Sequence, residues 1–373
     1  MRKLTLQRIS EAVNSRLGYV AGGRLGALCR PSSATFLLTE RCNARCVHCD
    51  IWKNKGKEAT PGLEGWSQVL RDLREWIGPK HVIFTGGEAL LTPYTLELVG
   101  LATSLGFQVE ILTHGYWRDS TKIEKLAMTN PWRITMSLDG VGETHSKIRG
   151  RKDFFELSNQ SVEALLRVRA QNKLNFTMRL KTVIMEHNLH NVGEIAQYAT
   201  RPGVEVFYQP IEQNYNTPEN PEWFESSDNW PRDTQKAIDA VRKLMQLKAS
   251  GMHIANTDRE LEVMVPYFQE PLGMRVVTQA HLAHRRQQLC AGLTMLQLQS
   301  NGDVTICSNR APVGNVKEKP IRQIWAERPR FWESGCCLTA PPDKAVSQKP
   351  GMSLPILKTP QASEELVPDD EAV

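Results

Sequence analysis

The sequence has 373 residues, a formal net charge of +5 at pH 7, and 40% hydrophobic against 23% charged residues. A chain of this length and composition buries a sizeable core, either as one large α/β barrel with an appendage or as two domains, which argues against global disorder. The positive charge is spread without a lysine- or arginine-rich block, so we expect no nucleic-acid partner. Charge interrupts every apolar run before the roughly 20 residues of a membrane helix, so we expect no membrane span.

The N-terminal segment 1–32 is basic but has no continuous apolar core, which argues against a secretory signal and favours a cytoplasmic protein. Leu6, Ile9, Val13 and Leu17 follow helical spacing, which predicts a short amphipathic helix lying against the domain. Membrane-surface binding is the alternative for this helix.

Strands and helices alternate over the next two hundred residues, which predicts a parallel sheet with crossover helices. The expected strands are short and apolar or β-branched, at Thr35–Thr39, His81–Thr85, Gln108–Thr113, Arg133–Leu138, Phe176–Val183 and Val204–Tyr208. The expected helices lie around Trp66–Trp76, Tyr94–Leu105, Thr121–Met128, Phe155–Arg169, His190–Tyr198 and Gln235–Leu247. Six such units indicate an α/β fold, either an open sheet or a partial TIM-like barrel.

Unusual polar sequences follow almost every expected strand. They are a cysteine loop, "TGGEALL", "THGYW", "SLDG" and "QPIEQNY". Because functional loops gather at the carboxyl ends of parallel strands, we expect these five sequences to meet on one rim.

The pattern changes beyond about residue 250. "LQLQSNGDVTIC" reads as a β-hairpin whose Asn301-Gly302 pair suits a type I′ turn, in a separate small unit. We therefore expect a core domain at 33–245, a small α+β unit at 246–338, and a disordered proline-rich, acidic tail at 339–373.

Three cysteines lie within eight positions, at Cys42, Cys46 and Cys49. The spacing C-x3-C-x2-C lets one loop place three thiolates around a [4Fe–4S] cubane, which leaves one iron open for a reactive ligand. A zinc site with His48 as the fourth ligand is the alternative, although zinc sites usually pair C-x2-C with a distant second pair.

"CNARCVHC" followed by "GGEALL" resembles the radical S-adenosylmethionine (SAM) superfamily, over roughly residues 33–209. The resemblance implies that Cys42, Cys46 and Cys49 hold the cluster and that the methionine end of SAM chelates the open iron. It also implies reductive cleavage of SAM to a 5′-deoxyadenosyl radical that abstracts hydrogen from a substrate. His48 occupies the position of an adenine-contacting side chain in that family.

The glycine motif has a physical reading beside the resemblance. Gly86 and Gly87 allow close approach of backbone to a ligand, and Glu88 offers a carboxylate to an ammonium group, which in the family belongs to SAM. Ser137 and Asp139 are expected to hydrogen-bond ribose hydroxyls, as polar residues of the family's fourth strand do, with a plain β-turn at Asp139 as the alternative.

Other polar residues have two interpretations. Arg179 and Lys181 share one strand face, where they bind the SAM carboxylate if that face is the lumen and are solvated otherwise. Candidate contacts of adenine or substrate are Tyr208 and Gln209 on the sixth strand and His114, Tyr116 and Trp117 in the third loop, where packing is the alternative.

The C-terminal cysteines extend the resemblance. "GETHSKIRG", "SNGDVTIC" and "VGNVKEKPIRQIW" are similar to sequences of the SPASM/twitch subgroup, which implies an auxiliary [4Fe–4S] cluster. Four cysteines are too few for two such clusters, so one auxiliary cluster is expected on Cys290, Cys307 and one or both of Cys336 and Cys337. Cys29 lies outside every motif and is expected to be structural.

The resemblance therefore implies a radical SAM enzyme with a reductant such as flavodoxin or ferredoxin. Ribosomally made peptides are the favoured substrates, although the short N-terminus argues against a separate peptide-recognition domain, and oxidation of a small molecule or cofactor precursor is the alternative. A non-catalytic metal-binding or electron-transfer protein is the alternative of a different class. It accounts for the cysteines but not for the glycine motif.

Overall fold

The computed structural model describes residues 13–14, 29–54, 59–200, 203–215, 217, 220, 222–271, 294–306 and 311–328. Most of the predicted N-terminal helical segment and all of the predicted disordered tail lie outside these residues, so neither prediction is tested. None of the helices in the described ranges combines the length and the hydrophobicity that a membrane span requires.

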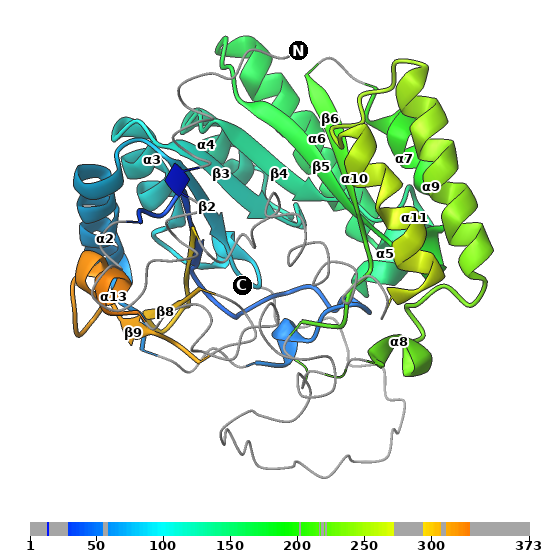
Figure 1. Cartoon of the computed structure of the whole chain (residues 1–373). Helices are drawn as coiled ribbons and strands as arrows, with labels where there is room; N and C mark the ends of the chain where they lie inside the picture. The colour runs from blue at the N-terminus through cyan, green and yellow to red at the C-terminus, as the bar shows by residue number, and fades with distance from the viewer. Residues whose placement is uncertain are drawn as a thin grey trace.

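Six parallel strands form one curved sheet in the spatial order β6-β5-β4-β3-β2-β1, with helices on its outer side (Figure 1). Each strand pairs in parallel with the strand that follows it in the chain, as in the register Thr35↔Ile83 between β1 and β2. The prediction of an α/β fold with a partial (βα)6 barrel is confirmed. The strands are β1 (Ser33–Leu37), β2 (His81–Thr85), β3 (Gln108–Thr113), β4 (Arg133–Ser137), β5 (Thr177–Ile184) and β6 (Val204–Pro210).

The two faces of this sheet differ because side chains alternate along each strand. Phe36, Phe84 and Leu180 point outward and are fully buried against the helices, whereas Thr35, Thr85 and Lys181 lie on the inner face and are half-buried. The covering helices are α2 (Gly62–Ile77), α3 (Thr95–Ser104), α4 (Thr121–Met128), α5 (Glu143–Arg149), α6 (Phe154–Gln171), α7 (Val192–Tyr198) and α9 (Thr234–Ala249). Short helices lie between them at η2 (Ile51–Lys53), η3 (Ala89–Leu91), η4 (Glu186–Asn188) and α8 (Trp223–Ser226).

The C-terminal hairpin belongs to the same sheet. Strand β7 (Met295–Leu298) pairs in parallel with β1, and β8 (Asp303–Thr305) and β9 (Gly314–Asn315) follow in antiparallel order, giving nine strands in one sheet. The hairpin predicted for the small C-terminal unit is therefore continuous with the sheet of the core. Without β7, the strand β1 would be an edge with unpaired backbone groups, and the hairpin satisfies them.

The hairpin turn also differs from the prediction. Gln299 N–H donates to Asp303 O over 2.8 Å and Gly302 N–H donates to Gln299 O over 2.9 Å, which closes a three-residue loop. Gly302 has φ +92°, but Asn301 has no positive φ, as a type I′ turn would require. The loop is therefore a turn followed by a glycine bulge, and Asn301 instead accepts a hydrogen bond from Asp303 N–H.

The segments after β6 pack onto both ends of the sheet. Helix α9 continues through the predicted domain boundary at residue 245, and α10 (Asp258–Glu262) and α11 (Met264–Gln269) pack beside it. Helix α13 (Ile321–Glu327) packs on α2, where the Trp325 indole N–H donates to Cys29 O over 2.7 Å. Cys29 is fully buried at this junction, as a structural residue would be.

Candidate functional site

The cysteine loop (residues 42–49) leaves the carboxyl end of β1. Cys46 is buried and Cys42 and Cys49 are half-buried, in a small cluster with Ala44 and Phe154. This cluster is separate from the main core and shields the three thiols with apolar groups.

Backbone hydrogen bonds clamp the loop from two sides. Arg45 and Val47 donate their N–H groups to the carbonyls of Arg149 and Ile148 at the end of α5, each over 3.0 Å. On the other side, the Asn229 side chain donates to Val47 O over 3.0 Å. The loop is therefore held by segments that lie a hundred and more residues away in the sequence.

The thiols need a positive partner to ionise. Burial, together with the nearby Glu88 and the thiols of Cys46 and Cys49, raises the pKa of Cys42 to about 12. Thiolates bind metals only when deprotonated, so iron would supply the charge that stabilises them here. Within the described ranges, no three His, Cys, Asp or Glu side chains are placed to hold a single metal ion. In a cubane each thiolate binds a different iron, and these three residues fit that donor set.

The glycine motif packs against the cysteine loop. A Cβ on Gly86 would lie 2.5 Å from Thr39 O, and one on Gly87 would lie 2.7 Å from Glu40 O, so both positions need glycine. The close approach is therefore to the protein's own backbone, which the sequence prediction attributed to a ligand. The carbonyls of Gly86 and Gly87 accept no hydrogen bond from the described residues and remain available to an ammonium group.

Replacing Gly87 by alanine is expected to separate the two loops and to lower cluster loading several-fold, measured as iron per chain after anaerobic reconstitution. Gly100 in α3 is the matched control, because nothing lies within 4 Å of a Cβ at that position. Gly100→Ala should load normally and stabilise the helix by about 0.5–1 kcal/mol. Equal iron contents in both variants would contradict the packing role of Gly87.

Glu88 holds the rim together from inside. Its carboxylate is 1% exposed and accepts hydrogen bonds from Leu90 N–H, the Thr113 hydroxyl and His114 N–H over 3.0, 2.9 and 2.8 Å. Burial raises the pKa of Glu88 to about 7 despite these donors. Both oxygens of Glu88 therefore have protein partners, and its predicted contact with a ligand ammonium stays a prediction.

The third loop supports the cysteine loop. The His114 Nε2 atom lies 2.7 Å from Asn43 Oδ1 and 3.3 Å from Glu88 Oε2, which links three rim segments. Burial lowers the pKa of His114 well below its usual value, so the imidazole is neutral. Tyr116 stacks on Phe154 with ring centroids 4.6 Å apart. His114 and Tyr116 therefore pack within the protein, which was the alternative to a contact with adenine or substrate.

Trp117 keeps a half-buried ring beside this cluster. It stacks on His114 at 5.9 Å, and the Lys122 ammonium lies 4.2 Å from its centroid. Its indole N–H has no partner among the described residues. Trp117 therefore remains a predicted substrate contact.

The Asp139 carboxylate contacts other groups of the protein. Its carboxylate is fully buried, accepts from Val183 N–H over 2.9 Å, and lies 2.5 Å from the Arg149 guanidinium. Burial opposes its ionisation, but Arg149 holds the pKa of Asp139 below its usual range. Neither the predicted ribose contact nor a plain turn describes this residue. Ser137, on the inner face, makes no hydrogen bond through its hydroxyl with the described residues and stays the ribose candidate.

The two residues predicted to bind the SAM carboxylate, Arg179 and Lys181, differ in their contacts on the inner face. Arg179 forms an ion pair with Glu205 over 2.6 Å, next to a second pair between Arg133 and Glu110. Lys181 lies two residues nearer the rim, beside Ser137 in the register. Burial lowers the pKa of Lys181, and its ammonium has no hydrogen bond or ion pair with the described residues. Arg179 is paired with Glu205, so Lys181 is the remaining candidate for the SAM carboxylate.

Two further predicted contacts differ in outcome. Tyr208 is fully buried on the outer face, where its hydroxyl donates to Val192 O over 2.8 Å, so the prediction of a ligand contact is wrong for this residue. Gln209 lies half-buried on the inner face and remains a candidate contact of adenine or substrate.

His48 lies within the cysteine loop. Burial lowers the pKa of His48 to about 4, and its Nδ1 atom has no partner within the described ranges.

Sequence reasoning missed Arg149 as an individual residue. Its guanidinium is buried and one terminal nitrogen lies 3.5 Å from Cys46 Sγ. The only sequence signal was the motif "GETHSKIRG", which reads locally as a charged loop. The structure makes it helix α5, whose last turn reaches the cysteine loop.

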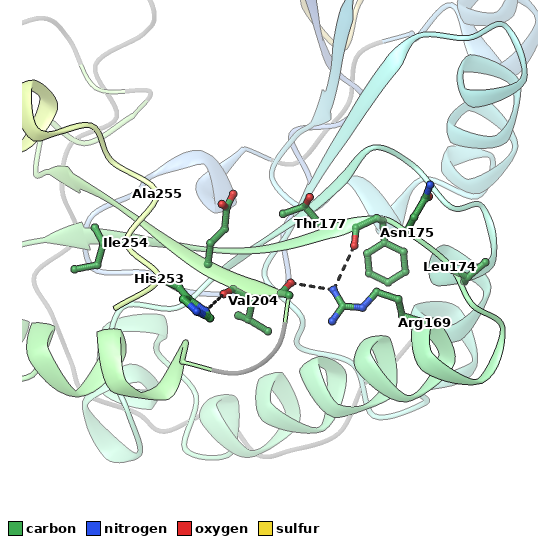
Figure 2. Close-up of a pocket in the computed structure, with 11 residues that line it drawn as sticks. Arg169, Leu174, Asn175, Thr177, Val204, His253, Ile254 and Ala255 are labelled. Carbon is green, nitrogen blue, oxygen red and sulfur yellow. Dashed lines mark hydrogen bonds between the residues drawn. The ribbon is translucent and has the colours of Figure 1, made fainter. Parts of the chain in front are cut away.

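A cavity of about 540 Å³ lies at the opposite ends of the strands, between the first residues of β5 and β6 (Figure 2). Arg169 lines this cavity and donates to Gly203 O over 2.9 Å, and His253 Nδ1 lies 3.0 Å from Val204 O. This cavity is far from the thiols along the strands, so it is not part of the rim site.

Family comparison agrees with the geometry of the rim. Residues 36–199 match the radical SAM superfamily, and residues 290–340 match the SPASM iron–sulfur cluster-binding domain. The chain belongs to the radical SAM superfamily. Its radical SAM domain contains all the rim residues up to Arg149, and its SPASM domain includes the hairpin that extends the sheet.

Relatives of this radical SAM chain include enzymes of two kinds. An AdoMet-dependent heme synthase of Methanosarcina barkeri is 26% identical over 79% of this chain and 82% of its own length. The sporulation killing factor maturation protein SkfB of Bacillus subtilis is 30% identical over 48% of this chain and 42% of its own length. Among solved structures, Streptococcus suis SuiB bound to S-adenosylmethionine has a TM-score of 0.62 at 14% identity, covering 88% and 72% of the two chains.

The predicted auxiliary-cluster ligands fall within the residues matched by the SPASM domain. All of them lie outside the described residues, so their assignment stays a prediction; they are Cys290, Cys307, Cys336 and Cys337.

Proposed function

We propose that this radical SAM enzyme binds a [4Fe–4S] cluster through Cys42, Cys46 and Cys49 and cleaves SAM reductively to start a hydrogen abstraction. The cluster, when bound, supplies one electron that breaks the S–C5′ bond of SAM. A low-potential donor such as flavodoxin or ferredoxin would provide that electron. The observation that carries the proposal is the packing of the three-thiol loop against a glycine loop, two of whose carbonyls accept no hydrogen bond from the described residues.

The chain's own residues would orient SAM on the inner face of the sheet. The carbonyls of Gly86 and Gly87 would accept from its ammonium group, and Lys181 would pair with its carboxylate. Ser137 would donate to or accept from the ribose, and the half-buried His48 would lie against the adenine. The apolar cluster around Phe154 would exclude water from the thiol side.

Anaerobically reconstituted protein is expected to form 5′-deoxyadenosine from SAM after addition of dithionite, measured by liquid chromatography. Lys181→Met should raise the SAM concentration at half-maximal rate about tenfold, because the SAM carboxylate would lose a half-buried cation. Lys236→Met, at an exposed position on α9, should leave that concentration unchanged. Protein with a loaded cluster that made no 5′-deoxyadenosine would refute the proposal and favour an electron carrier.

For the substrate, we propose a ribosomally made peptide. The supporting observations are the SkfB relative, named for maturation of a killing factor, and the half-buried Trp117 and Gln209, which follow β3 and end β6. Incubation with short peptides encoded beside the gene, followed by mass spectrometry, is expected to reveal a product of altered mass.

A tetrapyrrole is the second candidate substrate, because the chain covers more of the heme synthase than of SkfB. The chain covers 82% of the heme synthase but only 42% of SkfB. Titration with an iron porphyrin separates the two candidates. A saturable shift of its visible absorption at one porphyrin per chain would support the tetrapyrrole, and its absence together with peptide modification would support the peptide.

A further inference from the structure

Arg149 brings a fixed positive charge to one of the three cysteines. One terminal nitrogen lies 3.5 Å from Cys46 Sγ and the other lies 2.5 Å from Asp139 Oδ2, and all three side chains are buried. Among the described residues, the sulfur atoms of Cys42 and Cys49 accept no hydrogen bond from a guanidinium, although the Arg45 guanidinium donates to Cys42 O over 3.1 Å. The charge therefore reaches the cysteine loop mainly through a single sulfur.

The end of helix α5 and the cysteine loop both hold Arg149 beside Cys46. Helix α5 ends with Gly150 in the left-handed region at φ +73°, where a Cβ would lie 2.5 Å from Arg45 O. The loop N–H groups of Arg45 and Val47 bind the last carbonyls of the helix. The side chain of Arg149 thus has little freedom to leave Cys46.

The charges of Arg149 and Asp139 are not shared with a charged histidine beside them. Burial lowers the pKa of His145 to about 3, so its imidazole is neutral near pH 7. His145 Nδ1 accepts from Asp139 N–H over 3.0 Å, which fixes its tautomer. Arg149 and Asp139 are the charged groups that face Cys46 in this cluster, and they have opposite signs.

We propose that Arg149 is a positioning residue that raises the reduction potential of the cluster bound through Cys46, and that Asp139 sets how much of this charge reaches the sulfur. The inference rests on the proposed function. A reduced cluster carries one more negative charge, so a nearby cation and an N–H···S hydrogen bond stabilise it relative to the oxidised cluster. Asp139 offsets part of that stabilisation and holds the guanidinium in place.

The test is an anaerobic potentiometric titration followed by electron paramagnetic resonance, on the full chain without substrate. Only the signal that changes when SAM is added is analysed, which separates it from an auxiliary cluster. Arg149→Gln is expected to lower the ratio of reduced to oxidised cluster about tenfold at a fixed potential, equivalent to about 59 mV for one electron. Asp139→Asn keeps an acceptor for Val183 N–H and should shift the potential in the opposite direction.

Arg151→Gln is the matched control, because Arg151 is exposed two residues further on and should leave the potential unchanged. Arg149→Lys keeps the charge and should shift the potential less than Arg149→Gln, and it carries the test with Asp139→Asn if Arg149→Gln does not load iron. Shifts of the same sign in the Arg149→Gln and Asp139→Asn variants, or none in either, would overturn the inference. A wild-type cluster insensitive to SAM would instead overturn the proposed function.

Discussion

Replacing Cys46 by serine is expected to abolish formation of 5′-deoxyadenosine from SAM, by at least a thousandfold. A serine hydroxyl is a poor ligand for iron that prefers thiolate, and Cys46 is the most buried of the three cysteines, so no water can substitute for it easily. The measurements are iron and sulfide per chain after reconstitution and 5′-deoxyadenosine after reduction. Iron should fall by about one cluster per chain, with the SPASM domain retaining its own.

Cys29→Ala is the matched control, since Cys29 is also buried but lies at the junction of α2 and α13. Its iron content and SAM cleavage should equal those of the wild type. Retention of the SAM-sensitive cluster in Cys46→Ser, or its loss in Cys29→Ala, would contradict the assignment of the cysteine loop.

Replacing Glu88 by alanine is expected to destabilise the fold by about 3 kcal/mol near pH 6. Three buried donors lose their acceptor, and each such loss costs about 1 kcal/mol; the donors belong to Leu90, Thr113 and His114. The free energy of unfolding would be measured by urea denaturation of the cluster-free protein, so that metal binding does not contribute. An unchanged midpoint would show that the carboxylate does not hold the rim together.

The stability contributed by Glu88 should also depend on pH. Its pKa is raised from 4.5 to about 7 by burial, so between these values the folded state binds more protons than the unfolded state. The free energy of unfolding should therefore decline as pH rises from about 4.5 to 7, by up to about 1.4 kcal/mol per pH unit from this group. Glu88→Gln should flatten that part of the curve, and an unaltered slope would contradict the raised pKa.

The local features of the site were predictable because they lie within short stretches. Three thiols in one loop and two glycines after an apolar strand are visible without any fold. The alternation of apolar runs likewise predicted β2 and β3 to the residue and β1 within two residues, because burial on both strand and helix faces leaves a periodic pattern. The convergence of five sequences on one rim followed from the parallel order of the strands.

The roles of individual polar residues were less predictable. Glu88, Asp139 and Arg179 were candidates for ligand contact, and each has a protein partner: the His114 backbone, Arg149 and Glu205. A sequence shows that a carboxylate or a guanidinium is available, but it does not show whether a partner from another strand reaches it first. Buried charges require such partners, so these assignments depend on the neighbours.

The sequence by itself determined the class of chemistry, because the spacing of Cys42, Cys46 and Cys49 is a local property of one loop, and it determined the order of strands and helices. Only the tertiary structure decided that β7 completes the sheet beside β1 and that Arg149 lies against Cys46. Both contacts join residues more than a hundred positions apart. Their free energy comes from burial and charge pairing in three dimensions, which no local pattern of residues encodes.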